Sequence, residues 1–323
     1  MIGPIQAGLR QGAEWALARD YPTIERAAWA LFRRPSAFPP LDLAGLELAK
    51  TLGERASERP IRLRRLMAAA REAGGVPLAV IGDSHSTHLV RRSRMGERWL
   101  LPLHRLCTGA SARGLVNPEA AAGAGTKART FLAALPDETP LIFKFGQVDI
   151  EFVFTFKRLE ANAEAFDEAA FDTFADETVE RYLAFLTDAV PPGRRACAVV
   201  AGVFPPALSD AAWRQGYVDA HIAALHGGAA APADLAPRLA RLEIPSLAER
   251  TRLHAGFNVR LFEAARAAGF RVLDGFDALL GPDGTVKWAH LGRAAGTNHH
   301  LGYAASRAPL VEALWGALAE ARR

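Results

Sequence analysis

From residue 76 onward, short apolar runs alternate with longer amphipathic segments, and this alternation restricts the fold more than any other feature. The runs are Val76–Ile81, Leu141–Phe145, Ala196–Val203 and Phe270–Leu273. Short continuous apolar runs are typical of strands that are buried on both faces of a parallel sheet. The intervening segments have helical spacing, over Ala163–Ala189, Asp210–Leu225, Leu247–Ala268 and Tyr303–Ala321. We therefore predict an α/β fold with helices on both faces of a parallel sheet.

The first 75 residues have the spacing of amphipathic helices and no strand-like run. Apolar residues recur at helical intervals over Ile5–Ala18, Ile24–Phe32, Leu41–Leu52 and Ile61–Ala73, with prolines between these segments. We predict a helical extension over residues 1–75 and an α/β domain over residues 76–323. The extension is either a separate appendage or a cover over one face of the sheet.

Composition and charge exclude several classes of protein. Of 323 residues, 50% are hydrophobic and 23% are charged, which is the composition of an ordinary globular protein. The net charge is only +4 and the arginines are scattered, which argues against a nucleic-acid-binding arm. Cys107 and Cys197 lie far apart in apolar surroundings, so we expect free thiols. Since no leader pattern and no apolar run of about 20 residues is present, we expect a cytoplasmic protein without a membrane span.

Polar residues follow the predicted strands where a parallel sheet places its active sites, at the carboxyl ends. Gly82-Asp83-Ser84-His85 comes directly after the first run. A serine on such a strand-to-helix turn exposes its hydroxyl beside the first N–H groups of the helix, although Asp83 and Ser84 are also ordinary N-cap residues. The pair His299-His300 precedes the last predicted helix. A histidine from this loop could take a proton from Ser84.

In order and spacing, these segments resemble the SGNH (GDSL-type) hydrolases, which include esterases, deacetylases and carbohydrate O-acetyltransferases. Gly82–His85 looks like the first block of the family, in the GDSH form of several bacterial polysaccharide-modifying members. Gly114 is similar to the glycine of the second block, and Gly146-Gln147-Val148-Asp149 stands where the third block falls. His300-Leu301 resembles the last block. The resemblance covers about residues 76–322 and implies a three-layer αβα sandwich with a flavodoxin-like parallel sheet.

The resemblance also implies roles for single residues. Ser84 would be the nucleophile that forms an acyl-enzyme, and His300 would act first as a base and then as an acid. The oxyanion would be held by the backbone amides of Ser84 and Gly114. Gln147 would contribute its side-chain amide, because Val148 replaces the asparagine of the third block. The expected substrate is a small-molecule or saccharide O-acyl ester, either hydrolysed or used for acyl transfer, with no metal ion or cofactor.

The sequence departs from the family at the acid that orients the histidine. Three residues before His300 stands Thr297, where the family has aspartate. The orienting group would then be Asn298, a backbone carbonyl or another acid, or the site would be a Ser–His dyad. We expect His85 and His299 to contact substrate or to lie beside the site. Asp149 is expected to be a cap or a structural hydrogen-bond acceptor, with a catalytic base as the alternative.

Two other functions remain open. Asp83-x-His85 together with His299-His300 is similar to fragments of metal-dependent phosphoesterases, although the intermediate Gly-Asp-x-x-Asp element is not found. A catalytically degenerate carbohydrate-binding protein on the same fold is the other alternative. The phenylalanines Phe152, Phe154 and Phe156 alternate, which predicts a strand that packs in the core or forms a wall of the substrate site.

Overall fold

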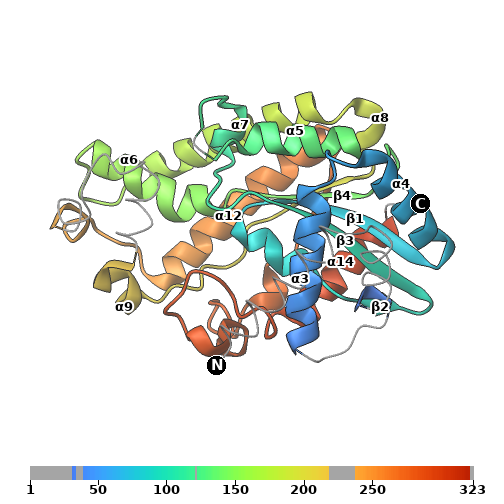
Figure 1. The fold of residues 1–323 in the computed structure, drawn as a ribbon. Helices are drawn as coiled ribbons and strands as arrows, with labels where there is room; N and C mark the ends of the chain where they lie inside the picture. The colour runs from blue at the N-terminus through green and yellow to red at the C-terminus, as the bar shows by residue number, and fades with distance from the viewer. Residues whose placement is uncertain (1–30, 34–38, 121, 218–236, 321–323) are drawn as a thin grey trace.

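A six-stranded, mostly parallel sheet forms the centre of the computed structural model, which describes residues 31–33, 39–120, 122–217 and 237–320 (Figure 1). The order across the sheet is β2-β3-β1-β4-β5-β6. The strands are β1 (Gly75–Gly82), β2 (Arg94–Met95), β3 (Arg98–Leu106), β4 (Leu141–Lys144), β5 (Ala198–Ala201) and β6 (Arg271–Leu273). Every neighbouring pair is parallel except β2 and β3, which form an antiparallel edge.

The four apolar runs in the sequence all form strands, namely β1, β4, β5 and β6. Every residue of β1, β4 and β5 is buried, as expected of a sheet covered on both faces. The sequence did not predict β3, which pairs with β1 from Gly75↔Trp99 to Gly82↔Leu106. Its apolar centre, Trp99–Leu103, carries Pro102, a residue that is uncommon inside a strand, and is flanked by arginine and histidine.

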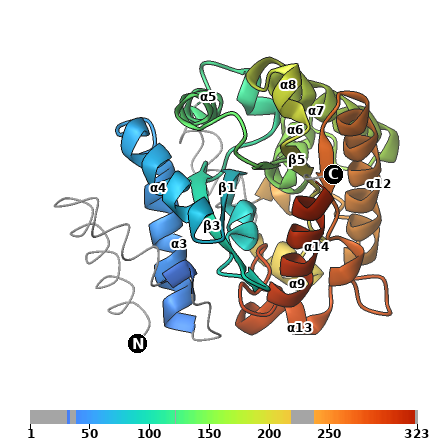
Figure 2. The ribbon, with the colours of Figure 1, turned by 90° about the vertical axis from the view of Figure 1, so that its right-hand side faces the viewer.

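Helices cover both sides of the sheet (Figure 2). They are α3 (Pro39–Glu54), α4 (Pro60–Glu72), α5 (Ala124–Ala134), α6 (Phe154–Glu160), α7 (Glu168–Ala189), α8 (Pro192–Arg195), α9 (Asp210–Ala212), α12 (Leu247–Ala267), α13 (Trp288–Leu291) and α14 (Arg307–Glu320). Figure 2 shows α5 and α7 on one side of the strands and α14 on the other, while α12 packs against α7 and β6. The structure is therefore an α/β fold with a mostly parallel sheet between helical layers.

The long helices begin at residues that cap them. Ser246 accepts a hydrogen bond from the backbone N–H of Glu249, and the Glu249 carboxylate accepts one from the backbone N–H of Ser246, which is a capping box at the start of α12. Asp167 caps α7 by accepting from the N–H of Ala169. Both helices keep the extent that the apolar spacing predicted to within a few residues.

The expectation of a strand at Phe152–Phe156 is wrong. A π-helical turn (Asp149–Val153) leads directly into α6 here. Phe154 packs edge-on against Phe171 of α7, with ring centroids 5.2 Å apart. Phe152 and Phe156 belong instead to a second, smaller apolar cluster. Phe152 and Phe156 are four residues apart and so lie on one side of a helical segment, while Phe154 packs into the main core, so the alternation does not mark one face of a strand.

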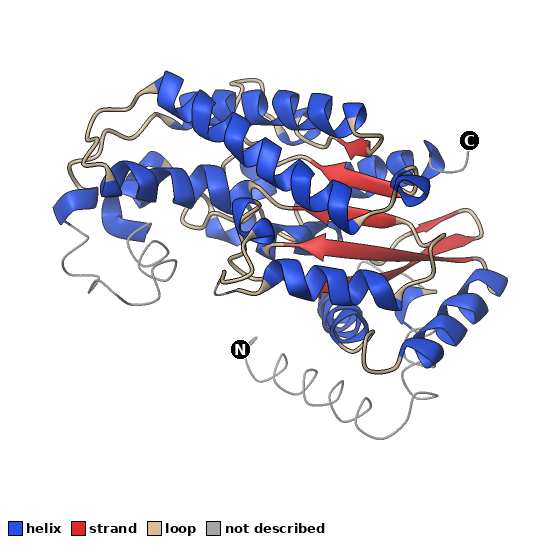
Figure 3. Ribbon diagram, turned by 90° about the horizontal axis from the view of Figure 1, so that it is seen from above, coloured by secondary structure: helices blue, strands red, loops and turns tan. Residues whose placement is uncertain are grey.

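The described part of the N-terminal region is helical and covers the sheet. α3 packs on β3 and α4 packs on β1 (Figure 3). Leu48, Leu63 and Met67 belong to the same apolar core as the strands, so these helices share the core of the sheet. The predicted helix Ile5–Ala18 and nearly all of Ile24–Phe32 lie outside the described residues, as does most of the second half of Asp210–Leu225.

The order of the strands defines where a ligand site is expected. From β1 the chain crosses to one side to form β3 and then to the other side to form β4, so the order reverses at β1. In open parallel sheets the ligand crevice lies at such a reversal, outside the carboxyl ends of the strands. Among the described helices, none has both the length and the apolar content needed to cross a bilayer.

Candidate active site

Ser84 stands at the carboxyl end of β1, where the strand turns into the 3₁₀ helix Ser84–Leu89. The Asp83 side chain caps this helix by accepting a hydrogen bond of 2.8 Å from the N–H of His85. Gly82 is required at the turn, because a Cβ there would lie 2.3 Å from the carbonyl oxygen of Lys144 on β4. The tight turn therefore presents the Ser84 side chain at the edge of the sheet.

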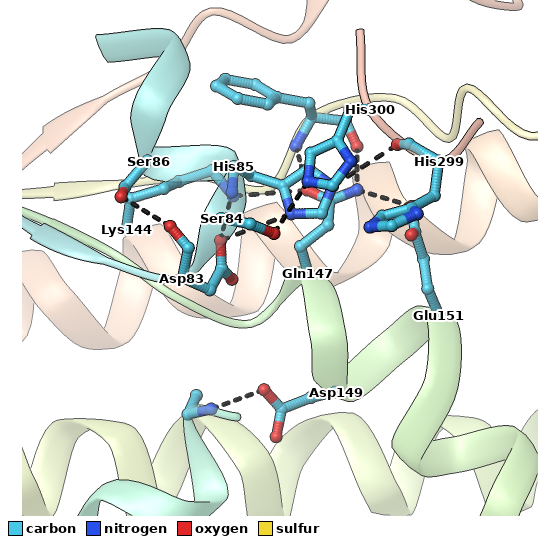
Figure 4. Close-up of polar contacts among 12 residues, drawn as sticks. Asp83, Ser84, His85, Ser86, Lys144, Gln147, Asp149, Glu151, His299 and His300 are labelled. Atoms are coloured by element: carbon cyan, nitrogen blue, oxygen red, sulfur yellow. Dashed lines mark hydrogen bonds and ion pairs between the residues drawn. The ribbon is translucent and has the colours of Figure 1, made fainter. Parts of the chain in front are cut away.

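His300 reaches Ser84 from the other end of the chain. Its Nε2 lies 2.8 Å from Ser84 Oγ, although the two residues are 216 positions apart (Figure 4). Both side chains are partly exposed to the same pocket. This is the distance expected of a serine and the base that deprotonates it.

Asn298 fixes the orientation and the tautomer of the His300 ring. Asn298 Oδ1 accepts a hydrogen bond of 2.9 Å from the backbone N–H of His300 and lies 3.1 Å from ring Nδ1. Since a backbone N–H can only donate, the amide atom beside it is the oxygen, and Nδ1 must carry the ring proton to donate to it. Nε2 is then the unprotonated nitrogen, and the Ser84 hydroxyl donates to it. Ser84, His300 and Asn298 thus form a Ser–His–Asn arrangement.

A pocket of about 770 Å³ opens beside the serine and histidine. Its lining combines Ser84, His299 and His300 with small residues of the segment 108–124, and with Val148 and Phe152. This volume lies within the range of roughly 300–1,000 Å³ that is usual for small-molecule sites. None of the described residues that line it carries a charged side chain other than histidine.

Gln147 does not take the oxyanion role that the sequence predicted. Its Nε2 donates to Glu151 Oε1 at 2.8 Å and to the carbonyl of Phe204 at 3.1 Å, and its Oε1 accepts from the N–H of Phe204. The side chain therefore joins β4 to the loop after β5. The π-helical turn places Val148, the next residue, in the pocket wall instead.

Gly114 lies in the pocket lining, as the resemblance implied. Its N–H donates to Ser111 Oγ at 2.9 Å, so this amide already has an acceptor. An oxyanion could use the Gly114 amide only by displacing the Ser111 hydroxyl. At the start of the 3₁₀ helix, the N–H of Ser84 has no acceptor within the helix itself, as is general for first-turn amides.

Asp149 holds the pocket loop and does not approach Ser84. Its carboxylate accepts hydrogen bonds from the backbone N–H groups of Ala112 at 2.6 Å and Arg113 at 3.2 Å. Figure 4 shows Asp149 on a separate level from the Ser84–His300 pair. Burial raises the pKa of this carboxyl to about 6, although the two N–H donors act in the opposite direction. Asp149 is thus a structural acceptor that ties the loop after β3 to the end of β4.

His85 and His299 flank the Ser84–His300 pair. The His85 ring stacks on the His300 ring, with centroids 4.4 Å apart and an angle of 22° between planes. His85 is buried, its Nε2 lies 3.4 Å from the carbonyl of His299, and its Nδ1 lies 3.4 Å from Asp83 Oδ1. Burial lowers the pKa of His85 well below its usual value, and the charges of His300 and Lys144 lower it further. The neutral ring supports His300 from one side.

His85, His299 and His300 are also the group of described residues that could hold a metal ion. Their candidate ligand atoms lie within 4.8 Å of one another. A tetrahedral zinc site would bring imidazole nitrogens to about 2.0–2.1 Å from the ion. A metal bound through His300 would have to replace the contact of its ring with Ser84 or the one with Asn298, so the residues fit a metal only if one of these two contacts is given up.

Buried charged groups lie behind Ser84. Lys144, at the end of β4, is fully buried, and its Nζ lies 3.3 Å from Gln147 Oε1 and 4.7 Å from the centre of the Phe204 ring. Burial raises the pKa of Asp83 and raises that of Glu151 to about 7. Burial also lowers the pKa of Lys144, while the two carboxylates oppose that change. Together, the buried side chains of Asp83, Lys144 and Glu151 connect the end of β1, β4 and the turn after β4 beneath the site.

Arg91 joins the serine helix to the histidine loop, a role that sequence reasoning missed. This buried guanidinium donates to the carbonyls of His88 and Tyr303, at 2.7 and 2.6 Å, and to Ser306 Oγ at 3.2 Å. The Tyr303 hydroxyl in turn donates to the carbonyl of Val90. The sequence signal was weak, because Arg91 is one of many arginines and two of its three partners, Tyr303 and Ser306, lie more than 200 residues away.

A scan against protein-family models, a search of curated proteins and a search of solved structures each found no match to this chain.

Proposed function

We propose that this protein is a serine-nucleophile hydrolase or acyltransferase that acts on O-acyl esters through an acyl-enzyme on Ser84. The observation that carries the proposal is the contact of 2.8 Å between Ser84 Oγ and His300 Nε2, with Asn298 Oδ1 at the other ring nitrogen. A hydroxyl, an unprotonated imidazole nitrogen and a group that orients the ring are the elements of the serine triad, which recurs on unrelated folds with different orienting residues.

In the first half-reaction, Ser84 Oγ attacks the ester carbonyl carbon while His300 Nε2 takes the hydroxyl proton. The tetrahedral intermediate collapses as the bond to the alkoxy group breaks, and His300 returns the proton to the leaving oxygen. In the second half-reaction, His300 deprotonates a water molecule or an acceptor hydroxyl, which attacks the acyl-enzyme. The proton returns to Ser84 Oγ. Water as acceptor gives an esterase, and a sugar hydroxyl gives an acyltransferase.

Two backbone amides are proposed to hold the oxyanion. Ser84 N–H belongs to the nucleophile itself, and Gly114 N–H becomes available when the oxyanion displaces the Ser111 hydroxyl. The Val148 side chain cannot donate a hydrogen bond, so the site lacks a side-chain amide at this position. We expect slower turnover than in an enzyme with a third donor, since one such donor contributes about 10²–10³ in kcat.

The topology is consistent with the resemblance to the SGNH hydrolases. Numbered along the chain, the five parallel strands have the spatial order 2-1-3-4-5, which is that of the flavodoxin-like sheet. The resemblance extends the proposal to esters of carbohydrates or glycoconjugates as substrates. Asn298, one position after the place of the family's aspartate, would take over its role of orienting the histidine.

A metal-dependent hydrolase is the second candidate, favoured by the proximity of His85, His299 and His300. The histidine geometry favours the serine enzyme, because both ring nitrogens of His300 already face protein partners. A carbohydrate-binding protein without activity would require neither the Ser84–His300 contact nor the defined tautomer of His300.

The test is turnover of p-nitrophenyl butyrate by the full chain and three variants. We expect Ser84→Ala and His300→Ala to lose at least about 10³ in kcat, which is the usual contribution of a nucleophile or a general base. His299→Ala, the matched control on the adjacent residue, should lose less than about tenfold, because His299 lines the pocket without contacting Ser84 Oγ. Equal losses for the two histidine variants would contradict the assignment of the base, and full activity in S84A would contradict the proposal.

A further inference from the structure

The lining of the pocket beside Ser84 includes an apolar wall. Its members are Ala110, Ala120, Ala122, Ala124, Val148 and Phe152. They come from two segments, the loop that leads from β3 into α5 and the turn after β4. The side chains of Val148 and Phe152 are buried, with 4% and 3% of their surface exposed, so their neighbours hold them in place at the base of the pocket.

We infer that this wall binds the acyl chain of the substrate and that the enzyme prefers acyl groups of four or more carbons over acetyl. The inference rests on the proposed acyl-enzyme at Ser84, and it names the substrate class of that site. A pocket of about 770 Å³ has far more room than an acetyl group fills. An acyl group on Ser84 Oγ has the pocket directly in front of it, since Ser84 is part of the lining.

Apart from Ser84 and the two histidines, the polar side chains of the described lining are Thr108, Ser111 and Asn117, all on the segment after β3. Ser111 Oγ already accepts from the Gly114 N–H, and Asn117 Oδ1 accepts from the N–H of Glu119. No lysine, arginine, aspartate or glutamate is among the described residues of the lining, so it offers no partner for a charged group. A sugar would leave most of its hydroxyls without partners against this wall, and unpaired buried polar groups are costly.

Phe152 is the member of the apolar wall that contacts a histidine. Its ring stands edge-on to His299, with centroids 5.2 Å apart and an angle of 88°. The alanines on the opposite segment leave space where larger side chains would fill it. Small side chains facing a fixed aromatic ring give a channel that suits a flexible alkyl chain better than a rigid ring system.

The first test is the chain-length dependence of kcat/KM for p-nitrophenyl acetate, butyrate, hexanoate and octanoate. Burial of each methylene favours binding about fourfold in an apolar site, so the kcat/KM value for butyrate, with two more methylenes, should exceed that for acetate by about 16-fold. The kcat/KM values should rise further for the longer esters before they level off. A flat series, or one that falls from acetate onward, would overturn the inference.

The second test narrows the pocket. Ala120→Phe should reduce kcat/KM for octanoate at least about tenfold while the acetate value changes less than about threefold. Ala170→Phe, on the exposed part of α7 and outside the pocket lining, is the matched control and should leave the series unchanged. The same loss for acetate and octanoate in A120F would show a general disturbance of the site and would contradict an acyl pocket.

A third measurement separates failure of this inference from failure of the proposed function. Titration calorimetry of S84A with p-nitrophenyl acetate and octanoate measures binding without turnover. Tighter binding of the octanoate, at least about tenfold, supports the acyl pocket even if the wild-type chain hydrolyses neither ester. Equal affinities overturn it even if Ser84 is shown to be a nucleophile.

Discussion

Asn298 Oδ1 lies 2.9 Å from the backbone nitrogen of His300 and 3.1 Å from Nδ1 of the same ring. One amide oxygen thus accepts from both the backbone and the side chain of the residue two positions later. The backbone contact prevents the amide from turning its NH₂ group toward the ring. An asparagine can therefore keep the imidazole in the tautomer that a serine nucleophile needs, a function usually performed by a carboxylate.

Removal of the Asn298 side chain should lower activity through the orientation of His300. We expect Asn298→Ala to reduce kcat for p-nitrophenyl butyrate about 10- to 100-fold, which corresponds to the loss of one hydrogen bond to a ring that becomes charged. Asn298→Asp should raise kcat and move the acidic limb of the pH–rate profile to higher pH, because a carboxylate stabilises the imidazolium. The exposed neighbour Thr297→Ala controls for disturbance of the loop. Unchanged kinetics in both Asn298 variants would contradict this role.

Loss of Arg91 should separate the serine helix from the histidine loop. Arg91→Met removes the donor to three acceptors on two segments, the carbonyls of His88 and Tyr303 and the hydroxyl of Ser306. We expect the free energy of unfolding to fall by at least about 2 kcal/mol, because buried acceptors are left without partners. Urea unfolding measures this change, with the exposed Arg94→Met as control. Wild-type stability together with wild-type kcat would show that Arg91 does not hold the site.

The pH dependence of stability should reveal the buried Glu151. Burial raises the pKa of its carboxyl from 4.5 to about 7, so the folded protein holds a proton there that the unfolded chain releases at lower pH. The contribution of this group to the free energy of unfolding is therefore complete below about pH 4.5 and is lost as the pH rises through about 7.

Glu151→Gln, which resembles the protonated acid, should not show that loss. Relative to wild type, E151Q should gain up to about 3 kcal/mol in unfolding free energy between pH 4.5 and pH 7.5. Urea titrations at several pH values measure the difference, and Glu180→Gln on the exposed surface of α7 should follow the wild type. Parallel curves for E151Q and wild type would mean that Glu151 is ionised in the folded protein throughout this range.

Chelation distinguishes the serine enzyme from the metal-dependent alternative. After dialysis against EDTA, ester turnover should remain within about twofold of the untreated protein, because no step of the serine mechanism uses a metal ion. A loss that Zn²⁺ or Mn²⁺ restores would instead assign the cluster of His85, His299 and His300 to metal binding.

Much of the fold could be predicted from the sequence, because the patterns that indicate strands and helices are local. The four continuous apolar runs identified β1, β4, β5 and β6, and their alternation with helical segments identified the α/β class. β3 was missed since Pro102 and the polar ends of the strand hide an apolar centre. The expectation for Phe152, Phe154 and Phe156 was wrong because three alternate aromatic residues can also lie on a helical segment, where the first and third pack in one cluster and the second in another.

Part of the site could also be predicted, because it depends on the same local sequence patterns. The position of Ser84 after a buried run and of His300 before the last helix follows from sequence order, and the structure brings their side chains together. The roles of Asn298 and Gln147 depended on side-chain direction. In the turn after β4, the side chain of Gln147 points at Phe204, and that of the next residue, Val148, points into the pocket. The spacing of the sequence alone does not specify which of the two adjacent side chains enters the pocket.

The most direct test of the central claim is labelling of the folded chain by a fluorophosphonate, with the modified residue located by mass spectrometry. The account predicts one modification on Ser84 in the wild type, none in S84A and at least about 10²-fold slower labelling in H300A, since His300 activates the hydroxyl. An unlabelled wild-type protein, or a label on a serine other than Ser84, would contradict it.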